Sequence, residues 1–131
     1  MTDKSTVGNI FCRFDFSNEL DVGLTLTLLD PPRGSKAWKQ PPPQTLSKGQ
    51  AVEVYLGATN LLGTKSDGKF TYKADKDVSV FIDVTCVCEL GTAGVLSGDS
   101  GDPDVTVVTS DFSPDIRPTT GNIQVNETKT T

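Results

Sequence analysis

The sequence predicts a single antiparallel β-sandwich of about seven or eight strands, spanning residues 1–131. Apolar residues alternate with polar ones at a spacing of two in several segments, which is typical of half-buried strands. Clusters of proline and glycine separate these segments, and no convincing helical spacing of apolar residues is found among them. A barrel is the structural alternative, because its strands show the same alternation.

Three predicted strands lie in the first half of the chain. The segment "NIFCRFDFS" (9–17) places isoleucine, cysteine and two phenylalanines on one face, opposite charged side chains. The segment "GLTLTLL" (23–29) alternates leucine with threonine, and "AVEVYLG" (51–57) alternates valine and leucine with glutamate and tyrosine. Each pattern gives a strand one apolar face for the core.

Four further strands are predicted in the second half of the chain. The segment "KFTYKA" (69–74) repeats the alternation, and "VSVFIDVTCVC" (78–88) places Val78, Cys86 and Cys88 on the same apolar face. Two shorter strands follow at "VTVVTS" (105–110) and "NIQVN" (122–126).

Turn-forming residues mark the expected connections. "SDG" (66–68) and "KADKD" (73–77) are turn signals, while "DPPRGS" (30–35) and "QPPP" (40–43) form a proline-rich loop that excludes a helix. The segment 91–104, "GTAGVLSGDSGDPD", is rich in glycine and aspartate. We expect it to be an exposed loop that is less ordered than the strands.

Composition excludes several functions. The net charge is −5 and no basic run occurs, so a nucleic-acid partner is not expected. The chain has no histidine, which removes the usual general base near neutral pH and the histidine-dependent nucleophile triads. We therefore predict a protein that is not an enzyme and needs no cofactor.

The amino-terminal segment "MTDKSTVGNIFCRFDF" lacks the features of a signal peptide. No stretch approaches the length of about 20 apolar residues that a membrane-spanning helix needs. We therefore expect a chain made in the cytosol.

Acidic residues gather in the glycine-rich segment. Asp99, Asp102 and Asp104 lie within six residues of one another in "DSGDPD". Oxygen ligands in such a loop are candidates for calcium, although the spacing is not that of an EF-hand. An ordinary acidic turn that holds no metal is the favoured interpretation, and calcium binding is the alternative.

The three cysteines, Cys12, Cys86 and Cys88, all fall on predicted inward faces. They can be buried thiols, or, with less support from their spacing and number, ligands of a zinc ion. Residues i and i+2 of a strand are too far apart for an easy disulfide, so Cys12 is the better intrachain partner for either Cys86 or Cys88. The remaining thiol, with Cys88 expected near an accessible strand end, is then a candidate for a bond to a second chain.

A set of residues between Asn18 and Val84 resembles the aegerolysin-type β-sandwiches, especially their bacterial crystal-inclusion branch. The matching residues are Asn18, Gly34, Trp38, Pro42, Pro43, Gly49, Gly68 and Tyr72. The resemblance covers about half of the chain and implies a β-sandwich. On physical grounds we expect Trp38 to cover one end of the core, and Gly68 and Gly49 to supply positive φ angles in tight turns.

The resemblance also implies two functions. A fungal member of the group packs into vacuolar crystals that act as gravity-sensing particles, and many relatives bind membrane lipids through aromatic residues. This chain has one tryptophan and two tyrosines, so its composition does not favour membrane binding. The first prediction is therefore a self-assembling homo-oligomer, linked by disulfides and favoured near its pI of about 4.5. A lipid-binding protein or one component of a pore-forming pair is the alternative.

Overall fold

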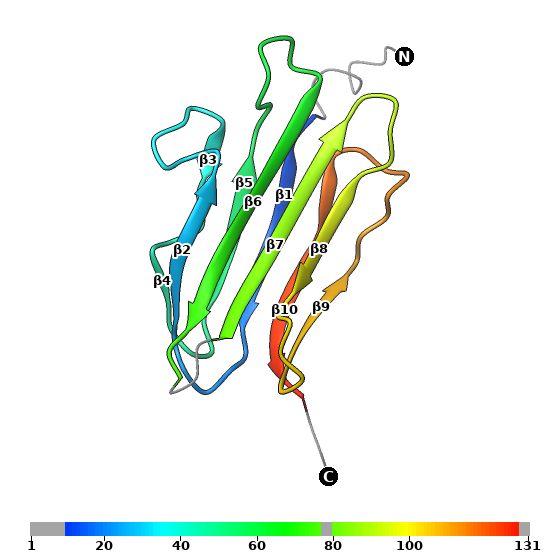
Figure 1. Ribbon diagram of the computed structural model, residues 1–131. Coiled ribbons are helices and arrows are strands. Elements are labelled where there is room, and N and C mark those ends of the chain that lie inside the picture. Colours follow the sequence, from blue (N-terminus) through cyan, green and yellow to red (C-terminus); the bar gives the residue numbers. More distant parts are fainter. Residues whose placement is uncertain (1–9, 77–79, 129–131) are drawn as a thin grey trace.

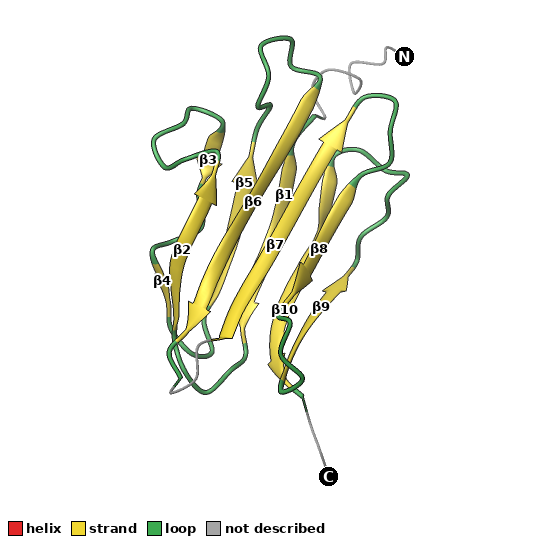
Figure 2. Ribbon diagram, in the orientation of Figure 1, coloured by secondary structure: helices red, strands yellow, loops and turns green. Residues whose placement is uncertain are grey.

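The computed structural model describes residues 10–76 and 80–128, and strands are its only regular elements there (Figures 1 and 2). In chain order the strands are β1 (Cys12–Asn18), β2 (Leu24–Asp30), β3 (Trp38–Gln40), β4 (Thr45–Leu46), β5 (Ala51–Leu56), β6 (Lys65–Ala74), β7 (Val80–Glu89), β8 (Val95–Asp99), β9 (Val105–Ser110) and β10 (Thr119–Glu127). The described residues include no helix that is long and apolar enough to cross a membrane.

The strands form two sheets that pack face to face (Figure 1). One sheet has the order β3-β5-β1-β10-β9, and the other has the order β4-β2-β6-β7-β8. The predicted β-sandwich is confirmed, with ten strands in the described residues in place of seven or eight, and the two sheets do not form the alternative barrel. The additional strands are β3, β4 and β8.

One pair of neighbours departs from the predicted antiparallel arrangement. β1 and β10 run parallel, with Cys12 opposite Thr119 and Asn18 opposite Val125. Parallel neighbours cannot be joined by a hairpin. These two strands need no direct connection, because they are the first and last strands in the chain.

The core lies between the sheets and is built from the alternating apolar positions. Phe14 and Phe16 of β1 meet Phe70 and Tyr72 of β6, with ring centroids 5.4 to 6.3 Å apart. All four rings are buried. Burying a ring of this size contributes roughly 1.5–3 kcal/mol to stability, so this cluster helps to hold the two sheets together.

Gly68 is not in a turn, contrary to prediction. It lies inside β6, opposite Cys86 of β7, and the predicted turn 66–68 is part of the same strand. A Cβ atom at Gly68 would lie 2.5 Å from Cδ2 of Leu56, which reaches over from the facing sheet. The glycine therefore leaves room for the Leu56 side chain between the sheets, and a larger residue would force that side chain to move. Gly49, in contrast, has the expected positive φ, 74°.

The segment 91–104 is not one long loop, contrary to prediction. Residues Val95–Asp99 form β8, which pairs with β7, and Leu96 is buried. A Cβ at Gly98 would lie 2.5 Å from Cγ1 of Val107, so the glycine makes room for β9. Of the other sequence predictions, the position of Val78, the end of the 73–77 turn and residues 1–9 lie outside the described residues.

Candidate functional site

The three cysteines lie in the core between the sheets. Cys12, Cys86 and Cys88 are each 0% exposed, and no disulfide joins them. Cys88 lies one residue before the end of β7, as expected, but the expectation that it is accessible there is wrong. β6 pairs with β7 as far as Glu89, so the strand continues past Cys88, whose side chain faces inward opposite Ser66. A bond from this thiol to a second molecule is blocked in the folded chain.

The surroundings of Cys86 also make its thiol unreactive. A hydrogen bond with Cys12 and burial raise the pKa of Cys86 well above its usual range. The hydroxyl of Ser66 lies 3.7 Å from Sγ of Cys12 and donates to the carbonyl of Leu56. Since the thiolate is the reactive form, a raised pKa and burial together suppress oxidation and nucleophilic chemistry.

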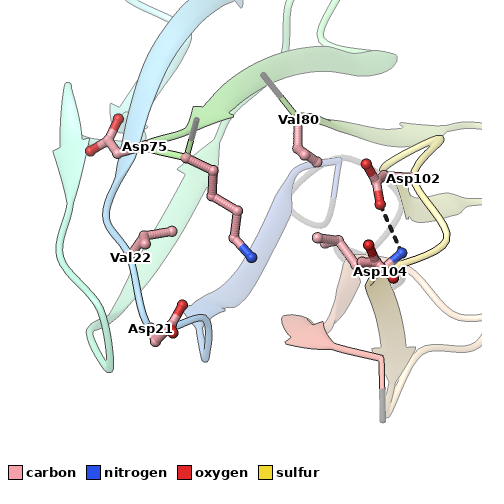
Figure 3. Close-up of a pocket in the computed structure, with 8 residues that line it drawn as sticks. Asp21, Val22, Asp75, Val80, Asp102 and Asp104 are labelled. Atoms are coloured by element: carbon pink, nitrogen blue, oxygen red, sulfur yellow. Dashed lines mark hydrogen bonds between the residues drawn. The ribbon is translucent and has the colours of Figure 1, made fainter. Parts of the chain in front are cut away.

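Asp102 and Asp104, two of the candidate calcium ligands, line a pocket at one end of the sandwich (Figure 3). The pocket has a volume of about 480 Å³ and is also lined by Asp21 and Asp75. Asp75 lies across the pocket from Asp102 and Asp104 in Figure 3. The pocket therefore gathers acidic side chains from three separate loops.

Asp99 and Asp102 accept hydrogen bonds from backbone amides two residues further along the chain. Oδ1 of Asp102 accepts a hydrogen bond from the Asp104 amide at 2.7 Å, and Oδ1 of Asp99 accepts one from the Gly101 amide at 3.2 Å. No group of three or more aspartate, glutamate, cysteine or histidine side chains within residues 10–76 and 80–128 is placed to hold a metal ion. Within the described residues this geometry is that of an acidic turn, and it offers no support for the candidate calcium site or the zinc alternative.

Several of the residues that carry the family resemblance hold the proline-rich segment on one lateral side of the sandwich, although Gly68 lies in the central strand β6. Trp38 is buried in the edge strand β3, and its Nε1 donates to the carbonyl of Pro31 at 2.6 Å. The Tyr72 hydroxyl donates to the carbonyl of Pro43, and burial raises the pKa of Tyr72. Pro42 is buried in the same loop, so these residues fasten the proline-rich segment.

Asn18 closes the same side from the end of β1. It is 0% exposed, and its Nδ2 donates to the carbonyls of Val22 at 2.9 Å and Leu46 at 3.2 Å. Its Oδ1 accepts from the Leu20 amide at 3.0 Å. One side chain thus joins the turn after β1 to strand β4.

The opposite lateral side ends in β9, whose residues 105–110 we call the β9 edge. This strand pairs only with β10 among the described strands, and its sequence, VTVVTS, carries no charge. Its outward side chains are Thr106, Val108 and Ser110, and Val108 is 42% exposed. An uncharged edge strand rich in β-branched residues is a ready template for pairing with another chain.

The neighbouring strand extends this uncharged surface. Asn122, Gln124 and Asn126 of β10 lie opposite Ser110, Val108 and Thr106, and therefore face outward with them. We call these six residues the neutral face. None of these six side chains is charged, in a chain with a net charge of −5, so they add no like-charge repulsion between two copies.

A second exposed apolar feature is the tip of the loop between β5 and β6, which sequence reasoning missed. Leu61 and Leu62 are 104% and 84% exposed. Asn60 fixes the loop, since its Oδ1 accepts from the amides of Thr64 and Lys65 at 3.0 and 3.2 Å. The adjacent leucines in "NLLG" were the available signal, although their exposure follows only from the loop geometry.

Comparison with known proteins supports the fold alone. No protein-family model and no curated protein matches the chain. The solved structure of RahU protein in complex with a TRIS molecule is similar, with a TM-score of 0.64 over 94% of this chain and 98% of that chain. The sequence identity is 7%, so the likeness concerns the β-sandwich and not the ligand.

Proposed function

We propose that this chain is a non-enzymatic structural protein that associates with copies of itself through the β9 edge. The observation that carries the proposal is the β9 edge itself: six residues without charge or proline, at the border of a sheet. Natural proteins usually protect such edges with charges, prolines or very short strands. Here the strand has none of these protections within its length.

The charge of the chain sets the conditions for association. At neutral pH the net charge of −5 opposes close packing, and near the pI of about 4.5 the repulsion fades. An acidic compartment such as a vacuole suits such a protein. The resemblance described above extends the proposal to ordered assemblies or crystals, of the kind that sediment as gravity-sensing particles.

The burial of the three thiols changes the assembly mechanism that the sequence suggested. Backbone pairing and apolar contact at the β9 edge take the place of intermolecular disulfides. Association should therefore be insensitive to a reducing agent, because Cys12, Cys86 and Cys88 are enclosed in each folded copy.

The test is the mass of the protein in solution, measured by sedimentation over a range of concentrations at pH 7 and near pH 4.5. We expect larger species at the acidic pH, with or without reductant. The variant Val108→Lys places a charge in the β9 edge and should abolish them, while its stability stays within about 0.5 kcal/mol of the parent.

Val95→Lys is the matched control for this experiment. Val95 is 38% exposed and lies on the edge strand of the other sheet, whereas Val108 is 42% exposed. The control should assemble like the parent. A parent that stays monomeric under every condition contradicts the proposed function.

A second candidate function, lipid binding, is favoured by Leu61 and Leu62. Two adjacent leucines held in solvent by an ordered loop can enter the apolar region of a bilayer. Co-sedimentation with vesicles that contain sphingolipid and sterol tests this function. Binding should disappear in the double variant Leu61→Ser/Leu62→Ser. It should persist in the control variant Leu28→Ser, because Leu28 lies in β2, away from this loop, and its side chain is 45% exposed.

A further inference from the structure

The backbone of the β9 edge offers a defined set of hydrogen-bonding groups. In an antiparallel pair, successive residues turn their N–H and C=O groups alternately toward the partner strand and away from it. The amide of Thr128 donates to the carbonyl of Asp104 at 2.9 Å, in register with the β9–β10 pair. The even-numbered residues of β9 therefore face β10, and Val105, Val107 and Thr109 turn their backbone groups outward.

The backbone groups of Val105, the first of these outward residues, already have hydrogen-bond partners. The amide of Val105 donates to the carbonyl of Asp102 at 3.2 Å, and its carbonyl accepts from the Ser100 hydroxyl at 2.6 Å. Val107 and Thr109 remain, and no strand of the described chain pairs with this side of β9. Two N–H and two C=O groups are thus presented side by side at the edge.

We propose that β9 pairs antiparallel with β9 of a second copy across a two-fold axis that passes beside Val108. Val107 of each copy exchanges both backbone hydrogen bonds with Thr109 of the other, which gives four in all. The two five-stranded sheets then continue into one another. This inference rests on the proposed function and names the contact that begins the assembly.

The alternation of the backbone groups selects this register. A shift by one residue would turn the neutral face of one copy to the opposite side of the joined sheet. A shift by two residues in one direction would need Val105, whose backbone groups are occupied. A shift by two in the other direction would need Asp111, whose positive φ of 56° is not that of a strand.

The charges at the ends of the strand fit the same register. With Val108 opposite its own copy, Asp111 lies opposite Val105, and Asp104 lies opposite residue 112. No carboxylate then faces another directly across the pair. Thr106 lies opposite Ser110, so the side chains that meet on the outer face are uncharged.

Cysteine crosslinking tests the register. In this register Val108 lies opposite Val108 of the second copy, and the two residues exchange no backbone hydrogen bonds. The Cα atoms of such a pair lie about 4.5 Å apart, within the range that a disulfide spans. Under a mild oxidant, Val108→Cys should give a reductant-sensitive covalent dimer. Thr106→Cys alone and Ser110→Cys alone should not, because each residue lies opposite the other.

A mixture of the last two variants, one carrying a size tag, should give the mixed dimer. The parent chain, with its buried thiols, is the control for background crosslinking.

Three outcomes would count against these proposals. If Thr106→Cys or Ser110→Cys crosslinks alone as well as Val108→Cys does, the register is wrong. If the parent forms larger species in sedimentation but Val108→Cys gives no dimer, this contact is wrong while the proposed function stands. A parent that is always monomeric overturns both.

Discussion

The two lateral sides of the sandwich end in different ways. On the side that we call the closed side, the edge strands are β3, with three residues, and β4, with two. On the other side, β8 and β9 have five and six residues. A short edge strand offers few backbone groups to another chain, so length alone already separates the two sides.

The closed side is also covered by its own chain. The amide of Leu26 donates to the carbonyl of Gln44 at 2.7 Å, and the Gln44 side chain donates back to the Leu26 carbonyl at 3.0 Å. Arg33 holds the same segment through the carbonyl of Pro42, at 2.7 Å. The proline-rich loop thus occupies groups of β2 that would otherwise be exposed.

The difference shows that the closed side is closed by sequence-specific anchors. Asn18, Trp38, Pro43 and Tyr72 all hydrogen-bond within it. Beyond Val105, whose backbone groups bond to Asp102 and Ser100, no strand of the described residues pairs with the outer side of the β9 edge. Residues that suggested a family resemblance therefore explain the closed side of the sandwich, whereas the proposed function depends on the other.

The largest effect is expected from opening the closed side with Asn18→Ala. The substitution removes three hydrogen bonds from a buried site and leaves the carbonyl of Leu46 and the amide of Leu20 without this partner. The free energy of unfolding should fall by about 2–3 kcal/mol, as measured by urea denaturation. Asn122→Ala is the control, because Asn122 is only partly buried and bonds a single exposed carboxylate. Equal losses in the two variants would show that Asn18 does not anchor the closed side.

The next effect concerns the packing beneath the β9 edge. Gly98→Val places side-chain atoms where Val107 now lies and should reduce stability by roughly 1–3 kcal/mol. Ser97→Val, at the adjacent exposed position, should change stability by less than about 0.5 kcal/mol. Adding Val107→Ala to Gly98→Val should restore part of the loss. A second substitution that restores nothing would place the strain elsewhere.

The sequence was sufficient to predict the strands that show alternation over five or more residues. Strands β3 and β4 were missed because two or three residues cannot display a period. Strand β8 was missed because glycine and serine interrupt it, and Gly98 is needed only because β9 packs against it. Gly68 was misassigned for the same reason: a glycine chosen by contact between sheets resembles a turn glycine in sequence.

The candidate site was harder to predict than the fold. The absence of charge in "VTVVTS" is visible in the sequence, but its place at the border of a sheet depends on strand order. The inward positions of Cys12, Cys86 and Cys88 were predicted from alternation and are observed. The accessibility of Cys88 was misjudged because the length of β6, its pairing partner, was not recognised.

The smallest effect is expected from the carboxylates that flank the β9 edge. The triple variant Asp99→Asn/Asp102→Asn/Asp104→Asn changes the formal net charge from −5 to −2. Asparagine keeps the side-chain oxygens that accept from the amides of Gly101 and Asp104, so stability should change little. Association at pH 7 should strengthen modestly, because each copy brings fewer negative charges beside the contact. Sedimentation measures this change.

A matched variant separates local from overall charge in that experiment. Asp30→Asn/Glu53→Gln/Asp67→Asn removes the same number of charges from β2, β5 and β6, none of which is a neighbour of β9 or β10 in sheet order. It should strengthen association less than the first variant if the β9 edge is the contact. Equal association by the two triple variants would mean that overall charge, and not the surroundings of the β9 edge, controls assembly.

The acidic segment itself should not respond to calcium. Adding calcium should leave the thermal stability of the parent unchanged, because the described carboxylates do not form a metal site.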